Sequence, residues 1–97
     1  MVEHIVLFKW KEGTPASAID GVMTALRALQ KDIEGIVSLS AGKDFSGRGQ
    51  GYTHCLHVQF ESRAALDAYG PHPSHQTVVQ NLINPIRDAV LAFDYEI

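Results

Sequence analysis

The sequence has one cysteine, no cluster of lysine and arginine residues, and no long apolar run. Cys55 cannot form an internal disulfide bond, and no secretory signal peptide is recognisable, so we expect a protein of the reducing cytoplasm. A membrane span needs about 20 consecutive apolar residues, and no segment approaches that length. Nucleic-acid binding needs a basic surface, whereas the formal net charge is −3. We therefore expect neither a membrane nor a nucleic acid as a partner.

The composition is typical of a globular domain. The chain has 97 residues, of which 45% are hydrophobic and 20% are charged, which favours a folded domain over a disordered segment. We expect a single domain over residues 1–97. A chain of this length buries only about 60–65% of its unfolded surface, so a partner that covers more surface would stabilise it.

The order of the apolar patterns predicts the fold class. Strands are predicted over residues 2–11, 36–43, 52–61 and 90–95. One amphipathic helix of about 18 residues is predicted between the first two strands, with Thr14 as its cap and Pro15 as its first residue. A second helical region covers residues 62–89, with a break at Gly70-Pro71 and a kink or local break at Pro85. This order predicts an α+β, ferredoxin-like βαββαβ fold with a four-stranded antiparallel sheet and helices on one face.

The first predicted strand is apolar on both faces. Val6 and Phe8 would point toward the helices, whereas Ile5 and Leu7 would point the other way, together with Cys55 of the third strand. A chain this short has no further element to cover that second face. We therefore predict that it packs on the same face of a second copy, so that two stacked sheets form a dimeric α/β barrel.

The segment from Tyr69 to His75 places a phenol and two imidazoles, those of His72 and His75, at a predicted helix start. The positive end of the helix dipole would keep His75 neutral near pH 7. A neutral imidazole can accept a proton while a tyrosine hydroxyl stabilises a developing oxyanion. The predicted topology brings His4 to the same end of the sheet and leaves His54 near the far end.

Other roles for these side chains stay open. Each histidine also suits a structural role, as a hydrogen-bonded residue of intermediate burial. His4, His72 and His75 could together bind a metal, but no Asp, Glu or Cys accompanies them in a recognisable ligand spacing, and we predict no metal site. Cys55 lies inside a predicted strand, where a buried and inert thiol is expected.

The chain closely resembles the stress-responsive A/B barrel domain family, also called Dabb, over nearly its whole length. The stretches that carry the resemblance are Val2-Glu-His4-Ile-Val-Leu-Phe-Lys9, Gly51-Tyr-Thr-His54, Phe60-Glu-Ser62, Tyr69-Gly-Pro-His72-Pro-Ser-His75 and Phe93-Asp-Tyr95. The resemblance implies a homodimeric α+β barrel. It therefore agrees with the dimer that the two-sided strand predicts.

One branch of this family consists of plant polyketide cyclases of the olivetolic acid type, which close a ring by an aldol-type condensation. Their catalytic tyrosine and histidine match Tyr69 and His75, and His4 and His54 match other histidines of that branch. Helix positions that hold larger aromatic residues in the cyclases differ here, which implies a different substrate. The candidate substrate-binding residues are His4, His54, Val6, Phe8, Val22, Met23, Leu26, Leu56 and His72.

These residues and this resemblance predict a small-molecule-binding, stress-responsive barrel protein. We expect cofactor-free acid–base activity of the cyclase or lyase type on an oxo or polyketide-like compound, with His75 as the base and Tyr69 as the hydrogen-bond donor. The sequence leaves open whether the chain is an enzyme. The alternative is a non-catalytic stress or stability protein whose homodimer is the functional unit. A cofactor-free monooxygenase of the related dimeric barrels is a third alternative.

Overall fold

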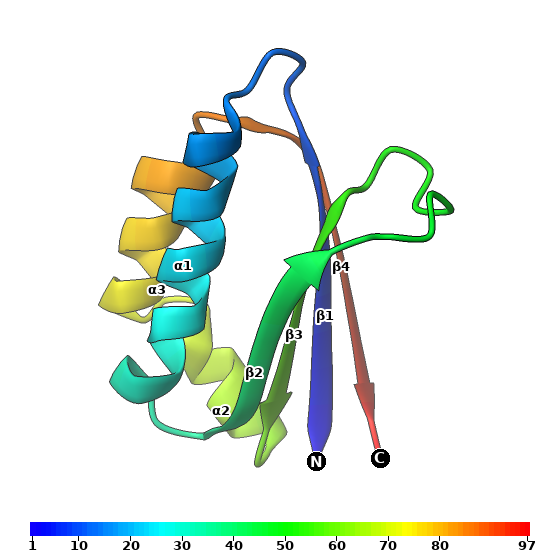
Figure 1. Cartoon of the computed structure of the whole chain (residues 1–97). Helices are drawn as coiled ribbons and strands as arrows, with labels where there is room; N and C mark the ends of the chain where they lie inside the picture. Colours follow the sequence, from blue (N-terminus) through cyan, green and yellow to red (C-terminus); the bar gives the residue numbers. More distant parts are fainter.

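Four antiparallel strands form one layer of the molecule, and the helices form a second layer on one face of them (Figure 1). The computed structural model describes all residues, 1–97. The elements are β1 (Val2–Trp10), α1 (Ala16–Asp32), β2 (Ile36–Lys43), β3 (His54–Phe60), α2 (Arg63–Tyr69), α3 (Pro73–Val78), the π-helical segment η1 (Val79–Ile83) and β4 (Arg87–Glu96). The strand order β2-β3-β1-β4 is that of the predicted ferredoxin-like βαββαβ fold, which is confirmed.

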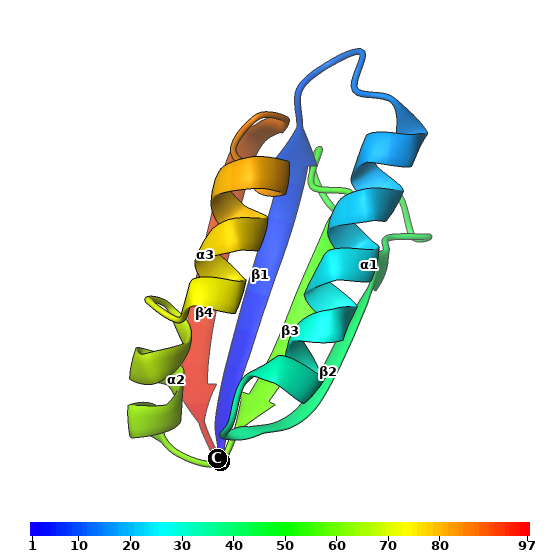
Figure 2. The ribbon, with the colours of Figure 1, turned by 90° about the vertical axis from the view of Figure 1, so that its left-hand side faces the viewer.

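The central strand β1 organises the core, because it pairs with both β3 and β4. Its alternate residues Val2, Val6 and Phe8 point toward the helices and are buried, as the period of two predicts. Figure 2 looks onto the helix-covered face, where α1 lies beside β2 and β3, and α3 lies beside β4.

The helix α1 presents one apolar stripe to the sheet. Its buried residues follow one another at helical spacing and are Val22, Met23, Leu26 and Leu29. The predicted start of this helix was wrong by one residue: Pro15 occupies the N-cap, and the Thr14 hydroxyl donates to the Lys11 carbonyl oxygen at 2.6 Å instead of capping. No helix in the chain is long and apolar enough to cross a membrane.

The largest departure from the predicted elements lies between α3 and β4. The helical region predicted over residues 62–89 ends with η1, and β4 begins at Arg87, three residues earlier than predicted. Pro85 has no N–H to donate and its ring clashes with a preceding helical turn, so the helix stops before it. The last turn is wider than in an α-helix, because the Asn84 N–H donates to the Val79 carbonyl oxygen at 2.8 Å.

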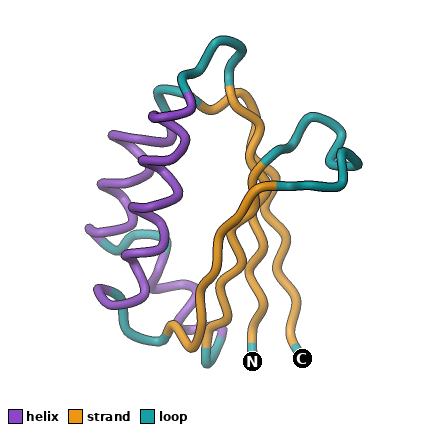
Figure 3. The backbone as a smooth tube through the Cα atoms, viewed as in Figure 1, coloured by secondary structure: helices purple, strands orange, loops and turns teal.

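The other face of the sheet carries no helix (Figure 3). On β1, Ile5 and Leu7 are half-buried on this face, and their partners on β4 are Phe93 and Leu91. Phe93 is 62% exposed and Leu91 49% exposed. Single exposed apolar residues are common, but here they form a continuous patch over two paired strands. We call this the open apolar patch and define it as Ile5, Leu7, Leu91, Phe93 and Tyr95.

The opposite half of the open face is polar. Glu3 is buried there at 5% exposure, and its carboxylate accepts hydrogen bonds from Gln59 Nε2 and His57 Nε2, each at 3.0 Å. The hydrogen bond from Gln59, followed by that from His57, lowers the pKa of Glu3. These partners satisfy a carboxylate that burial would otherwise make unfavourable. The open face is thus divided into an apolar half over β1 and β4 and a polar half toward β3.

Gly35, in the turn between α1 and β2, offers a test of this packing. Its φ is +89°, and an added Cβ would lie 2.6 Å from the Cβ of Ala65. Gly35→Ala should lower the free energy of unfolding by about 2–4 kcal/mol, because it combines left-handed strain with a clash that the short Ala65 side chain cannot relieve. Chemical denaturation of the variant measures this loss. The matched control is Gly13→Ala, where φ is +81° but no atom lies within 4 Å of an added Cβ. We expect this control to lower the free energy of unfolding by about 1 kcal/mol. Equal losses in the two variants would contradict close packing of α2 on this turn.

Candidate functional site

A cavity of about 190 Å³ lies between the sheet and the helical layer. Alternate residues of β1 and β4 form its floor, and α3 with η1 forms its roof. Its lining residues are His4, Val6, Phe8, Leu26, Leu56, Tyr69, His75, Val79, Ile83, Asn84, Arg87, Val90 and Ala92. The structure therefore brings together seven of the predicted site residues: His4, Val6, Phe8, Leu26, Leu56, Tyr69 and His75.

The other predicted site residues lie outside this cavity. Val22 and Met23 are 0% and 4% exposed and belong to the closed core between α1 and the sheet. His72 is the N-cap of α3, where its Nδ1 accepts a hydrogen bond from the Ser74 backbone N–H at 3.1 Å. His72 is close to the site residues in sequence, but its ring caps the N-terminus of α3 and does not line the cavity.

His54 lies at the far end of the sheet, as the topology predicts, and its ring is held by neighbouring side chains. The Trp10 Nε1–H donates to His54 Nδ1 at 3.0 Å, and the Thr53 hydroxyl lies 2.8 Å from the same nitrogen. Burial, followed by the charge of Lys43, lowers the pKa of His54. His54 therefore supports the strand ends around Trp10 rather than the cavity.

His75 lies in the first helical turn of α3 and faces the cavity. Its Nδ1 lies 2.9 Å from the Gly70 carbonyl oxygen. A carbonyl oxygen can only accept, so Nδ1 carries the proton and Nε2 of the neutral ring carries the lone pair. The Gln76 side chain donates to the same Gly70 carbonyl oxygen at 2.8 Å and so helps to hold that oxygen in place. His75 is thus oriented as a proton acceptor by the turn that precedes its own helix.

Burial is the main reason why the pKa of His75 lies below its ordinary value of 6.5, with smaller contributions from His4 and His72. The predicted direction is the same, although the predicted cause was the helix dipole. Because the unfolded chain binds this proton more readily, stability should fall as the pH drops below about 6.5 and should be fully present above it. NMR titration of the ring should give a midpoint below 6.5. A midpoint above that value would contradict a neutral base at physiological pH.

Tyr69 ends α2 and is 2% exposed. Its ring centroid lies 4.2 Å from that of His75 and 5.9 Å from that of His4. Burial raises the pKa of Tyr69 far above its ordinary value, so the phenol keeps its proton. Its hydroxyl is buried without a hydrogen-bond partner, and no other buried side-chain polar atom in the chain is left in this way. Such a group normally costs about 1–3 kcal/mol.

His4 is held by an acid that the sequence analysis did not identify. Its Nδ1 forms a hydrogen bond with the carboxylate of Asp94, which lies directly opposite on β4. The carboxylate fixes the orientation of the ring, which packs edge-on against Tyr69. No group of three or more His, Cys, Asp and Glu side chains lies in an arrangement that could hold a metal ion.

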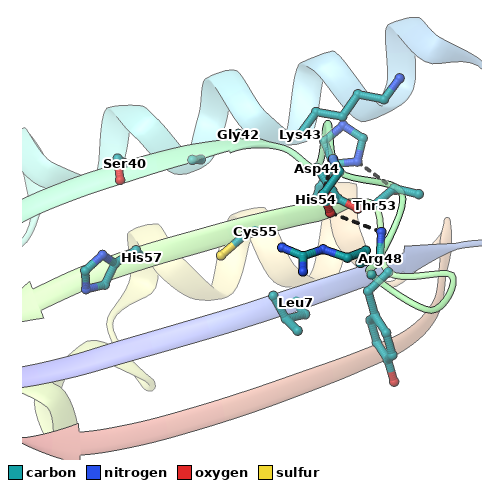
Figure 4. A pocket seen from close by; sticks show the side chains of 14 residues that line it. Leu7, Ser40, Gly42, Lys43, Asp44, Arg48, Thr53, His54, Cys55 and His57 are labelled. Atoms are coloured by element: carbon teal, nitrogen blue, oxygen red, sulfur yellow. Dashed lines mark hydrogen bonds between the residues drawn. The ribbon is translucent and has the colours of Figure 1, made fainter.

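A larger hollow of about 710 Å³ lies on the open face of the sheet (Figure 4). The loop between β2 and β3 overhangs it, and Figure 4 shows the Arg48 side chain reaching over the strands beside Leu7 and Cys55. Burial raises the pKa of the Cys55 thiol, as expected for an inert strand cysteine. This hollow contains neither Tyr69 nor His75, and it lies on the face predicted to meet a second copy.

The sequence analysis missed six cavity residues on η1, β4 and their connection: Val79, Ile83, Asn84, Arg87, Val90 and Ala92. A signal for two of them was present. Val79 and Ile83 follow His75 at intervals of four residues and so lie on the same side of a helix. Arg87 could not be placed in this way, because its position on β4 depends on a bulge opposite Lys9 and Trp10.

Comparison with known proteins places the chain in a family. The model of the stress responsive A/B barrel domain matches residues 2–97. The HS1 protein of Arabidopsis thaliana, a stress-response A/B barrel domain-containing protein, is 32% identical over 97 residues, which cover 98% of this chain and 88% of HS1. A longer stress-response A/B barrel domain-containing protein of the same plant is also 32% identical over 98% of this chain, but the chain spans only 36% of its length.

Solved structures agree with this placement. The crystal structure of At3g17210 from Arabidopsis thaliana has a TM-score of 0.88 at 31% identity and covers 100% of this chain and 95% of its own. A dimeric protein with a ferredoxin-like fold from Bacteroides fragilis has a TM-score of 0.82 at 25% identity, covering 99% and 95%. The hydroxynitrile lyase of Passiflora edulis shares the fold, with a TM-score of 0.88 at 22% identity, covering 99% and 92%. On the family match and these relatives, the chain belongs to the stress responsive A/B barrel domain family.

Proposed function

We propose that this protein binds a small oxo compound in the cavity beneath α3 and carries out cofactor-free acid–base chemistry on it. His75 is the base, Tyr69 is the hydrogen-bond donor, and His4 supports the tyrosine. The observation that carries the proposal is the buried Tyr69 hydroxyl without a partner, on a ring whose centroid lies 4.2 Å from that of His75. A carbonyl oxygen of a ligand would satisfy the hydroxyl, and the adjacent carbon would then lie near the base.

The chemistry follows from these two groups. His75 Nε2 removes a proton from the carbon beside the carbonyl. The electron pair of that C–H bond becomes the C=C bond of an enolate, and the carbonyl oxygen takes the negative charge. The Tyr69 O–H donates to that oxygen, and its high pKa keeps the proton available for donation. The imidazolium can then return a proton to the enolate carbon, which regenerates the ketone and exchanges its hydrogen with the solvent.

Similarity to other proteins supports this class of reaction. The Tyr69 and His75 pair matches the catalytic pair of the polyketide cyclase branch that the sequence resembles. The hydroxynitrile lyase from Passiflora edulis shows that the same fold occurs in a lyase. The cavity is smaller than the roughly 300–1,000 Å³ of typical ligand pockets, so we propose a substrate smaller than a polyketide of that branch.

The test is deuterium exchange into small methyl ketones, followed by proton NMR in deuterated water. The wild-type protein should accelerate exchange at the carbon beside the carbonyl. Tyr69→Phe, which keeps the ring, should lose about 10–10³-fold of that acceleration. It should keep or gain thermal stability, because it removes a buried hydroxyl without a partner. A structural role for Tyr69 predicts the opposite result, with no exchange to lose and an earlier melting transition.

The homodimer is the second part of the proposal. We propose that a second copy covers the open apolar patch, so that two sheets stack into a barrel. The patch includes Phe93 at 62% exposure and Leu91 at 49% exposure, and the Bacteroides fragilis protein of the same fold is dimeric. The same observation favours the alternative function, a non-catalytic stress protein whose dimer is its working unit. The exchange experiment separates the two, since the alternative predicts a dimer without activity.

We propose that the protein is cytoplasmic, because its lone cysteine cannot form an internal disulfide bond. Cys55 is half-buried on the open face, beside the proposed dimer contact. A thiol in that position is compatible with a reducing compartment.

A further inference from the structure

The cavity is polar at both ends and apolar between them. Tyr69, His75 and His4 form the inner end, and Asn84 and Arg87 form the outer end. The residues between them, among them Val6, Phe8 and Val90, are apolar. The inner end is closed, with Tyr69 only 2% exposed, whereas Asn84 and Arg87 are exposed at the mouth.

A bulge in the sheet is what brings Arg87 to this cavity. Along β4, Val90 and Ala92 point toward the helices, so regular alternation would turn Arg87 to the open face. The register shifts between Lys9 and Trp10, and Arg87 thereby lies opposite Trp10, whose ring stacks on Phe8 on the helix-covered face. Bulges often redirect one side chain in this way beside a functional site.

Arg87 has no partner within the chain. The ion pairs of the protein join His4 to Asp94, His57 to Glu3 and Arg63 to Glu96, and none of the side-chain hydrogen bonds involves Arg87. The guanidinium group is planar and carries paired N–H donors that match the two oxygens of a carboxylate. A single free arginine beside an amide therefore suits a ligand with one carboxylate at the mouth.

The dimensions of the cavity define the rest of the ligand. His4, Val6 and Phe8 line it in turn, so it runs along β1 for about 13 Å at the usual rise of a strand. A volume of about 190 Å³ spread over that length favours a slender chain. The neutral carbonyl can enter the closed end, while the charged group stays at the exposed mouth, where its desolvation cost is small.

We infer that the substrate class is an unbranched oxo acid, with its carbonyl at Tyr69 and His75 and its carboxylate at Arg87 and Asn84. This inference rests on the proposed function and names its substrate. Recognition at the mouth then sets the distance from the carboxylate to the reacting carbon, because the slender cavity holds the chain extended.

The experiment compares levulinic acid and its longer unbranched methyl-ketone homologues with their methyl esters, by calorimetric titration and by deuterium exchange. For the wild type, acids should bind more tightly with increasing length until the carboxylate reaches Arg87. The acid of that length should then bind about fivefold more tightly than its ester. Arg87→Gln should remove the preference for the acid, and Arg87→Lys should keep part of it. Arg27→Gln is the control, since Arg27 lies on α1 outside the cavity and should leave the preference unchanged.

Three results would overturn the inference. Equal binding of acid and ester by the wild type would show that Arg87 does not recognise a carboxylate. An acid preference that survives in Arg87→Gln would show the same. Failure of every oxo acid to bind would also overturn it. If short ketones without a carboxylate still undergo exchange that depends on His75, the proposed function stands while the substrate class falls. If neither binding nor exchange is found, both fall.

Discussion

Replacing His75 with alanine should lower the rate of ketone deuterium exchange by about 10²–10⁴-fold, the usual contribution of a general base. The Nδ1–H of His75 is fixed on the Gly70 carbonyl, so Nε2 is the only nitrogen of the ring available to accept a proton. The effect should be largest above the pKa of the ring, which burial lowers, and the difference between the variants should shrink as the pH falls below it. Exchange rates measured by NMR across this range test both statements.

The control for this variant is His72→Asn. His72 also carries an imidazole in the same segment, but its ring caps α3 and is not part of the cavity wall. Asparagine can replace it as an N-cap acceptor, so helix and activity should both be retained. If His75→Ala retained the wild-type rate, or if His72→Asn lost as much as His75→Ala, the assignment of the base would be wrong.

Replacing Leu7 with glutamate should weaken the proposed dimer by about 100-fold or more. Leu7 pairs with Leu91 in the open apolar patch, so stacking of a second sheet would bury the new carboxylate without a partner. An unpaired buried charge costs several kcal/mol unless it is neutralised or the contact opens. Sedimentation equilibrium should show the variant as a monomer at concentrations where the wild type is a dimer.

Two further measurements make this test specific. Leu7→Met keeps the volume and the apolar character, and it should leave the dimer intact. Circular dichroism should show that the glutamate variant keeps its fold, because Leu7 is only half-buried within one chain. A folded Leu7→Glu dimer with unchanged affinity would mean that copies do not meet through this face.

The layers and faces of the fold could be predicted because they depend on local periodicity. The alternation of β1 gives its buried side correctly at Val2, Val6 and Phe8, and the spacing of Val22, Met23, Leu26 and Leu29 gives the buried stripe of α1. The end of the last helix could not be placed with the same accuracy. A kink or a local break was predicted at Pro85, and the helix breaks before it; the early start of β4 at Arg87 was not predicted.

The site residues that the order of the elements brings together could be predicted. The contact that depends on how two strands pair was missed. Tyr69 and His75 are close in sequence, and the βαββαβ order brings His4 to them. Asp94 reaches His4 only because β4 pairs with β1 in one particular register. The alternation along β4 indicates which residues share a face, but it does not show which of them lies opposite His4. The ring of His72 was assigned to the site by proximity alone, although a residue directly before Pro73 is well placed to cap the helix.

The π-helical turn of η1 has an evolutionary consequence. Such a turn contains one residue more than the α-helical turn that would fill the same length, and it forms part of the roof of the cavity at Val79 and Ile83. Loss or gain of one codon within η1 would therefore rotate the roof residues over β4 while α1, the sheet and the His4–Asp94 pair keep their places. Descendants of this sequence could change the shape of the ligand they accept by one such event, without acquiring a new core.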